Sequence, residues 1–329
     1  MDMLKDKKVT VTGAGGFIGS HLTERLLRHK AHVTALVRYT STGRAGWLEY
    51  LPPSLKKEIT ILYGDIRDPD ICRQAAAGSS QIFHLAAQIA IPYSYIAPRD
   101  FLEVNGRGTI NMLQAAREAG VKRFLHVSTS EVYGTARYLP MDENHPQTAQ
   151  SPYAASKIAA DRMVEAFYHS YALPTVIARP FNCYGPRQSA RAVVPTIILQ
   201  AMNGRTIRLG RVDTCRDLNY VADIVDGMIG TAAADVAGKT LNLASGDTYA
   251  VKDIVSAVGD IMGKKLRIVT EKRRLRPGAS EVLRLQGDAS RAEELTGYRR
   301  RHSLTGGLEK TIAFYNRHRD LFKKEDYQI

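Results

Sequence analysis

The chain has 329 residues, of which 44% are hydrophobic and 24% charged, the composition of a folded globular protein with a large core. The formal net charge of +13 suits an anionic small substrate, whereas nucleic acid is not expected as a partner because the basic residues lack interleaved aromatic residues and a recognition motif. The chain has no apolar signal segment or membrane-spanning run, and its 3 cysteines lack metal or disulfide spacing, so we expect a cytoplasmic protein without a metal or a membrane partner.

A short β-branched strand and a glycine turn open the chain. Residues 9–12 predict a buried strand, and the glycines that follow begin an apolar pattern with helical spacing. Such a turn lets the backbone approach a pyrophosphate, which the free amide groups of a helix N-terminus attract. We therefore expect a dinucleotide to bind at Gly13, Gly16, Phe17, Ile18 and Gly19.

The second predicted strand, residues 32–37, ends without a carboxylate. In dinucleotide-binding folds an acidic residue at this place binds the ribose 2′-hydroxyl, whereas an arginine accommodates a 2′-phosphate. Arg38 stands here and favours NADP as the cofactor, with NAD possible. The alternative interpretation is a surface arginine beyond a strand.

Further strands are predicted at residues 59–63, 82–85, 123–128 and 175–178, and helices at residues 98–119, interrupted by Gly106 and Gly108, and 153–171. Asp65 follows the third strand and is expected either to accept from an adenine amino group or to start the next turn. Small residues after the fourth strand leave room for a ligand. The predicted cofactor site therefore also includes Asp65, Ile66, Leu85, Ala86 and Ala87. The alternation predicts an α/β fold, a doubly wound parallel sheet of Rossmann type.

The chain changes character after Arg179, where prolines, glycines and basic loops interrupt short helices. A helix is predicted at residues 218–233 and a core strand at residues 240–244. We predict a cofactor domain at residues 1–178, to which residues 217–245 return, and a smaller mixed α/β substrate lobe formed by residues 179–216 and 246–329.

Tyr153 and Lys157 lie four residues apart and therefore share one face of a helix. A lysine ammonium near a phenol favours the phenolate, so we expect Lys157 to lower the pKa of Tyr153 towards the working pH. A phenol tuned in this way is suited to act as the general base for an alcohol that is oxidised.

With this pair in place, the chain resembles the extended short-chain dehydrogenases/reductases, the epimerase and dehydratase family that acts on nucleotide sugars. The matching motifs cover nearly the whole chain and lie at residues 12–19, 64–68, 84–87, 128–134, 153–157, 179–186 and 216–217. The resemblance implies that Tyr153 takes the proton of the sugar 4-hydroxyl, that Lys157 binds the nicotinamide ribose, and that Thr129 holds the 4-hydroxyl. It also implies a set of substrate-binding residues, any of whose arginines would alternatively be a surface charge: Ser130, Asn182, Arg187, Arg191, Arg216 and Arg276.

Glu131 decides the subclass that the resemblance implies. The 4-epimerases of the family usually carry a small or apolar residue here, whereas a carboxylate is similar to the 4,6-dehydratases and to the UDP-glucuronate decarboxylases. In a dehydratase Glu131 would remove the proton of C5 while water leaves C6. Ser130 stands where many such dehydratases have Asp, so one carboxylate, or a water, would have to serve both proton transfers. The alternative interpretation of Glu131 is a salt-bridge partner near the crevice.

Residues 91–98, 185–195 and 275–282 resemble, more narrowly, dehydratases that act on GDP-linked N-acetylglucosamine in legionaminic acid biosynthesis. The predicted function is therefore a nucleotide-sugar 4,6-dehydratase acting on an NDP-hexose or NDP-N-acetylhexosamine. The alternatives are a UDP-glucuronate decarboxylase, an NDP-sugar 4-epimerase or, from another class, a catalytically silent NAD(P)-binding regulator. The helices at residues 98–119 and 153–171 resemble those that form a four-helix bundle in dimers of the family, so we expect a homodimer, although their apolar residues equally suit a core.

Overall fold

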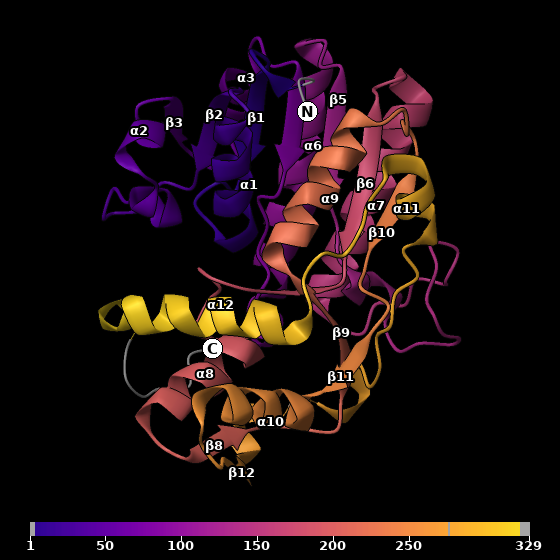
Figure 1. Ribbon diagram of the computed structural model, residues 1–329. Helices are drawn as coiled ribbons and strands as arrows, with labels where there is room; N and C mark the ends of the chain where they lie inside the picture. The colour runs from indigo at the N-terminus through magenta and orange to yellow at the C-terminus, as the bar shows by residue number, and fades with distance from the viewer. Residues whose placement is uncertain (1–3, 276, 323–329) are drawn as a thin grey trace.

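Seven parallel strands form the central sheet of the protein, whose computed structural model describes residues 4–275 and 277–322 (Figure 1). The strands are β1 (Lys8–Thr12), β2 (His32–Val37), β3 (Ile59–Tyr63), β4 (Gln81–His84), β5 (Arg123–Val127), β6 (Thr175–Pro180) and β10 (Thr240–Leu243). Their order is β10-β6-β5-β4-β1-β2-β3, and every adjacent pair is parallel. The strand order therefore reverses between β1 and β4, the switch point at which open α/β sheets bind ligands beyond the carboxyl ends of the strands. The predicted doubly wound α/β fold is confirmed.

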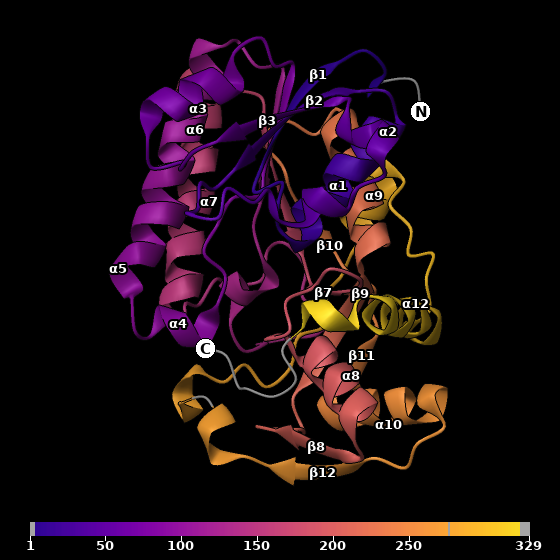
Figure 2. The same cartoon turned by 90° about the vertical axis from the view of Figure 1, so that its left-hand side faces the viewer.

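Helices cover both faces of this sheet (Figure 2). One face carries α1 (Phe17–Arg28) and α9 (Val221–Ala233), and the other carries α3 (Pro69–Ala76), α6 (Gly108–Glu118) and α7 (Pro152–Tyr171). The apolar spacing explains the packing, since Leu22 and Leu26 lie one turn apart on α1 and are both fully buried. Short helical segments precede β3, namely η2 (Gly46–Tyr50) and α2 (Pro53–Lys56). None of the helices in the described part of the chain has the length and apolar character needed to span a membrane.

The helix predicted at residues 98–119 is continuous rather than interrupted at its glycines. It consists of α5 (Pro98–Phe101), a π-helical turn η3 (Leu102–Arg107) and α6, and the short helix α4 (Ile91–Ser94) precedes it. Gly108 serves close packing, because a Cβ atom there would lie 2.5 Å from the Ile66 side chain. The π turn brings Asn105 into the interior, where its amide donates to the Gln88 carbonyl and to Ser156 Oγ.

The remaining elements form a smaller lobe at the carboxyl ends of the strands (Figure 1). Its strands and helices are β7 (Asn182–Tyr184), α8 (Val193–Asn203), β8 (Thr206–Leu209), β9 (Cys215–Tyr220), β11 (Thr248–Ala250), α10 (Val251–Met262), β12 (Arg267–Thr270), η5 (Lys272–Arg274), η6 (Gly278–Ser280), α12 (Leu304–Arg317) and η7 (Arg319–Leu321), whereas α11 (Ser290–Thr296) returns to the central sheet and packs on α9 and β10. One small sheet has the order β11-β9-β7 and another pairs β12 with β8. The helix predicted from residue 218 is wrong at its start, because residues 218–220 pair with β7 as part of β9 and the helix begins at Val221.

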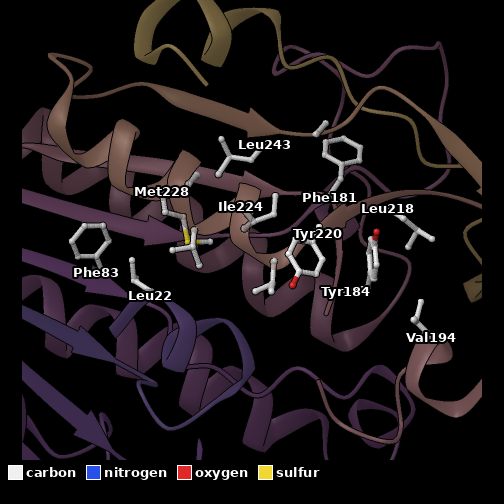
Figure 3. Close-up of a cluster of buried hydrophobic side chains, with 14 of the residues drawn as sticks. Leu22, Phe83, Phe181, Tyr184, Val194, Leu218, Tyr220, Ile224, Met228 and Leu243 are labelled. Atoms are coloured by element: carbon white, nitrogen blue, oxygen red, sulfur yellow. The ribbon is translucent and has the colours of Figure 1, made fainter. Parts of the chain in front are cut away.

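The apolar core continues from the central sheet into the lobe (Figure 3). Leu22 of α1 and Phe83 of β4 lie at one end of this cluster, and Tyr184 of β7 and Val194 of α8 lie at the other. Each of the four is at most 1% exposed. The lobe is therefore packed directly on the central sheet. This continuous core fixes the position of the lobe relative to the carboxyl ends of the strands. The division into a cofactor domain and a substrate lobe stays a prediction.

Candidate active site

The glycine turn after β1 is packed so tightly that side chains would not fit. Gly13 has a φ of +69°, and a Cβ atom there would lie 2.9 Å from the Ala86 amide nitrogen. A Cβ atom at Gly19 would lie 2.2 Å from the Gly13 carbonyl oxygen. Gly16 is the N-cap of α1, so the first-turn amide groups meet neither a capping side chain nor a carboxylate from residues 17–19. These features fit a dinucleotide pyrophosphate, which requires close backbone approach and free amide groups.

A chain of hydrogen bonds holds the end of β4 against this turn. Thr12 Oγ1 accepts from the amides of Leu85 and Ala86 at 3.1 and 3.0 Å, and lies 2.8 Å from His84 Nδ1. Because the oxygen already accepts two bonds, its proton is directed at His84 Nδ1, and His84 Nε2 then donates to Thr109 Oγ1 at 3.1 Å. Burial lowers the pKa of His84 well below its ordinary value, so this imidazole is neutral.

At the predicted adenosine end of the site, Asp65 and Arg67 form an ion pair at 2.7 Å. This hydrogen-bonded pair lowers the pKa of Asp65. The turn into α3 is made by Asp68, whose carboxylate caps the helix through the Asp70 amide at 2.9 Å. Arg38 is exposed beyond β2, and the Ile66 side chain is buried beneath α6.

Tyr153 and Thr129 meet although 24 residues separate them along the chain. The N-cap Ser151 accepts from the Ala154 amide at 3.1 Å and so begins α7 at a point that puts Tyr153 in its first turn. Thr129 follows β5 and caps the short turn η4 (Ser130–Tyr133) by accepting from the Glu131 amide at 3.2 Å. The side chains of Tyr153 and Thr129 are hydrogen-bonded, and Tyr153 is only 7% exposed.

The pKa of Tyr153 differs from the sequence-based expectation. Burial raises it above the ordinary value of a phenol, and the hydrogen bond with Thr129 offsets only part of this rise. The expected lowering by Lys157 is absent among the described residues that act on Tyr153, because the ammonium is directed at β5: Nζ donates to the Val127 carbonyl at 2.8 Å and lies 3.2 Å from His126 Nε2. Burial lowers the pKa of Lys157 itself to about 8.

A buried polar cluster behind Lys157 was not predicted from the sequence. Asp161 Oδ2 accepts from Arg179 at 2.9 Å and from Ser128 Oγ at 2.9 Å, and Asp161 Oδ1 lies 3.4 Å from His126 Nε2. Arg179 is 2% exposed and also donates to the Tyr133 hydroxyl at 3.1 Å. The missed signal was the spacing of Asp161, one further helical turn beyond Lys157 on the same face of α7.

Glu131 and Ser130, neighbours in the η4 turn, differ in burial. Ser130 is 2% exposed and lies in the interior, and its predicted contact with substrate stays a prediction. Glu131 is half-buried and close enough to Tyr153 for its charge to raise the pKa of the phenol. None of the described residues gives the Glu131 carboxylate an ion pair or a hydrogen bond, so the salt-bridge interpretation has no support.

Two of the predicted substrate residues lie in the small sheet of the lobe. Asn182 on β7 is half-buried, and among the described residues its buried Oδ1 atom has no hydrogen-bond partner. Arg216 on β9 is 8% exposed and forms an ion pair with Glu281 at 3.4 Å. A buried acceptor and a buried guanidinium in one sheet offer a neutral and a positive contact to an anionic ligand.

Of the other predicted substrate arginines, those that the structure describes lie outside this small sheet. Arg187 forms an ion pair with Glu24 of α1 at 2.6 Å and bonds Ser20 Oγ, so it joins the lobe to the cofactor side of the molecule instead of projecting freely at a substrate. Arg191 is exposed, and Arg276 lies outside the described residues. No group of three or more His, Cys, Asp and Glu residues within the described part of the chain is arranged to hold a metal ion.

The sequence and the fold match known proteins over nearly their whole length. The model of the family described as GDP-mannose 4,6 dehydratase matches residues 10–311. The chain is 33% identical over 314 residues to the UDP-glucose 4-epimerase of Mycolicibacterium smegmatis, covering 94% of this chain and 98% of the relative. It is 33% identical over 316 residues to a dTDP-glucose 4,6-dehydratase of Streptomyces griseus, covering 94% of each. The crystal structure of dTDP-glucose 4,6-dehydratase from Streptomyces venezuelae with NAD and TYD bound has a TM-score of 0.87 at 30% identity, covering 96% of this chain and 99% of that one.

Proposed function

The chain belongs to the GDP-mannose 4,6 dehydratase family, within the short-chain dehydrogenases/reductases that comprise nucleotide-sugar dehydratases and epimerases, and from this premise we propose that it is a nucleotide-sugar 4,6-dehydratase. The observation that carries the proposal is the Glu131 carboxylate beside Tyr153, which forms no ion pair or hydrogen bond with the residues that the structure describes. A carboxylate that no protein group engages is available to a ligand or to a proton transfer. Glu131 follows Thr129 by two residues, so its carboxylate is placed to act as a second acid/base group on a substrate that the Thr129 hydroxyl holds.

The proposed reaction divides the proton transfers between Tyr153 and Glu131. Tyr153 takes the proton of the 4-hydroxyl from a sugar that Thr129 holds; because burial raises the pKa of this phenol, it must lose its own proton before the step. A nicotinamide dinucleotide, when bound, supplies the acceptor for the C4 hydride and its later donor to C6. Glu131 removes the proton of C5, which the 4-keto group makes acidic, and gives it to the 6-hydroxyl as the C6–O bond breaks. One water leaves. When the hydride reaches C6, C5 takes up one proton, which equals the proton that Tyr153 removed from the 4-hydroxyl, so the reaction is balanced.

For the substrate we propose a GDP-linked N-acetylhexosamine. The support is the resemblance of residues 91–98, 185–195 and 275–282 to dehydratases of that specificity, together with the positive lobe residue Arg216. Relatives named for dTDP-glucose and UDP-glucose are about equally similar to this chain, so nucleotides of all three bases belong in the test.

The first experiment is mass spectrometry of the products formed from GDP-, UDP-, dTDP- and CDP-sugars, including the N-acetylglucosamine and glucuronate forms. Loss of one water from a hexose or N-acetylhexosamine is the expected result and identifies the nucleotide at the same time. Loss of carbon dioxide from the glucuronate would instead assign a decarboxylase, and an isomer of unchanged mass would assign a 4-epimerase. If no sugar is turned over, the dehydratase proposal fails.

The Glu131→Gln variant separates the two halves of the reaction. We expect C4 oxidation to persist, so that reduced nicotinamide accumulates on the enzyme, while water loss stops. Glu58→Gln makes the same chemical change at an exposed residue between α2 and β3 and should dehydrate like the wild type. Full dehydration by Glu131→Gln would contradict the proposed role.

We propose NADP as the preferred cofactor because Arg38, exposed beyond β2, is free to meet a 2′-phosphate. The competing outcome is NAD, which is bound to the similar Streptomyces venezuelae protein. Calorimetric titration of the wild type and of Arg38→Ala with both dinucleotides decides between them. An NADP preference that falls by about tenfold in Arg38→Ala supports the proposal, since a hydrogen bond to a charged group contributes about 1.5–3 kcal/mol. Equal affinities in the wild type would overturn it.

We further propose that the protein is a homodimer joined through the helix at residues 98–119 (α5, η3 and α6) and through α7. Leu102 on η3 is 55% exposed and Tyr171 at the end of α7 is 50% exposed, which leaves apolar surface on this side of the molecule. Light scattering of the purified chain should give twice the mass of the monomer. A monomeric mass at micromolar concentration would overturn this proposal.

A further inference from the structure

The Lys157 ammonium is held from behind by strand β5. Nζ donates to the Val127 carbonyl at 2.8 Å and lies 3.2 Å from His126 Nε2. Lys157 is 3% exposed and His126 is fully buried. An ammonium has three N–H donors, so two are directed at β5 and one is left for a ligand beyond the strand ends.

His126 acts as the acceptor of this contact. Its Nε2 atom also lies 3.4 Å from Asp161 Oδ1, and one nitrogen cannot accept from Lys157 and donate to Asp161 together. Burial and the neighbouring Lys157 charge lower the pKa of His126 to about 4, so the ring is neutral when Lys157 is charged. Nδ1 then carries the ring proton, and within the described residues this N–H is buried without an acceptor, a cost that the contact with the Lys157 ammonium offsets.

The charges around the contact between Lys157 and His126 explain why a neutral acceptor preserves the positive charge of Lys157. Asp161 is already engaged through Oδ2 by Arg179 and Ser128, so its charge is largely matched by the Arg179 guanidinium. Lys157 then contributes the uncompensated positive charge of the cluster. An imidazole holds the ammonium in place without cancelling that charge, whereas a second carboxylate would cancel it.

We propose that His126 is a positioning residue: it accepts a hydrogen bond from Lys157 and so aims the remaining N–H of the ammonium at the cofactor ribose. The inference rests on the proposed function, because an aimed lysine matters to a reaction that begins with proton transfer to Tyr153. His126 acts through Lys157 and touches neither substrate nor cofactor in this assignment.

The test compares His126→Gln with His126→Met, two unbranched side chains of similar length of which only the first ends in a hydrogen-bond acceptor. His126→Gln should keep most of the rate of C4 oxidation. His126→Met should lower kcat about tenfold to a hundredfold with little change in KM, as expected for the loss of a hydrogen bond to a charged group. His145→Met removes a histidine that is also buried, at 3% exposure, but lies outside the cluster, and controls for the general effect of the change.

A second readout needs neither substrate nor cofactor. The carbon resonance of labelled lysine, assigned to Lys157 with a Lys157→Arg variant, reports the pKa of the ammonium in the free protein. His126→Met should lower this pKa relative to the wild type because the charged form loses an acceptor, and His126→Gln should leave it nearly unchanged. The charged and titratable groups that interact with Lys157 are Asp161 on α7, His126 on β5 and His84 on β4. Arg179 on β6 lies across the cluster, and Tyr153 stands one helical turn earlier on α7.

Equal kcat values for the Gln and Met variants, or an unchanged Lys157 pKa in His126→Met, would overturn the proposal. The same holds if both His126 variants fail to fold while His145→Met folds, since His126 would then serve folding alone. Failure of the proposed function is distinguishable, because it appears in the product of the wild type and leaves the lysine titration unaffected.

Discussion

The charged residues on the two sides of Tyr153 differ in whether other protein groups bond them. Behind the phenol, Lys157, Asp161 and Arg179 are at most 3% exposed, and each has a hydrogen-bond partner inside the protein. In front, Glu131 is half-buried, and no described residue bonds its carboxylate. Compensated buried charges hold geometry, whereas an uncompensated carboxylate beside a hydroxyl pair is available for proton transfer. Substitutions on the two sides should therefore separate stability from chemistry.

The largest effect is expected where the two sides meet. Tyr153→Phe keeps the edge-on ring contact with Phe101, whose centroid lies 6.2 Å away, but removes the hydroxyl that takes the proton. We expect the rate of C4 oxidation in a single turnover to fall by about 10²–10⁴-fold. Tyr171→Phe, on the exposed end of the same helix, should oxidise substrate at the wild-type rate. A Tyr153→Phe variant as fast as the wild type would remove Tyr153 from the mechanism.

On the buried side, Asp161→Asn should destabilise the fold by about 3–5 kcal/mol, because it leaves the Arg179 charge buried without a counter-charge. The free energy of unfolding in urea measures this effect. Asp260→Asn makes the same change at an exposed residue of α10 and should alter stability by less than about 0.5 kcal/mol. Equal stabilities of the two variants would mean that the buried pair contributes little.

The buried histidines also make stability depend on pH. The folded protein lowers the pKa of His126 to about 4, whereas the unfolded chain binds a proton near the ordinary value of about 6.5. This contribution is complete above about pH 6.5 and is lost as the pH falls towards 4, with a slope of about 1.4 kcal/mol per pH unit for one histidine. Urea unfolding of the wild type and His126→Gln at intervals across this window should show a shallower slope for the variant. Identical slopes would contradict a neutral, buried His126.

The smallest effect is expected for the stability of Glu131→Gln. Because no described residue bonds the carboxylate, its replacement by a neutral amide of the same size should change the free energy of unfolding by less than about 0.5 kcal/mol. Thermal unfolding monitored by circular dichroism checks this. A loss of more than about 1.5 kcal/mol would identify Glu131 as a structural residue and would weaken the contrast between the two sides of Tyr153.

The sequence predicted those features that depend only on residues close together along the chain. The glycine turn at residues 13–19 and the pairing of Tyr153 with Lys157 on one helix face are such features. The glycines of residues 98–119 misled the prediction, because Gly108 permits close contact with Ile66 instead of ending the helix. The burial of Ser130 was not predicted either, since it depends on how η4 packs in the folded protein.

The sequence by itself determined the parallel α/β sheet, the position of its glycine turn and the residue types available at the strand ends, because alternating apolar periods and glycine spacing act locally. Only the tertiary structure decided that Arg187 bonds α1, that the Lys157 ammonium is directed at His126, and that burial raises the pKa of Tyr153. Each of these depends on which strand lies beside which and on how much water is excluded between them. Such long-range contacts and desolvation have no counterpart in the spacing of residues along the chain.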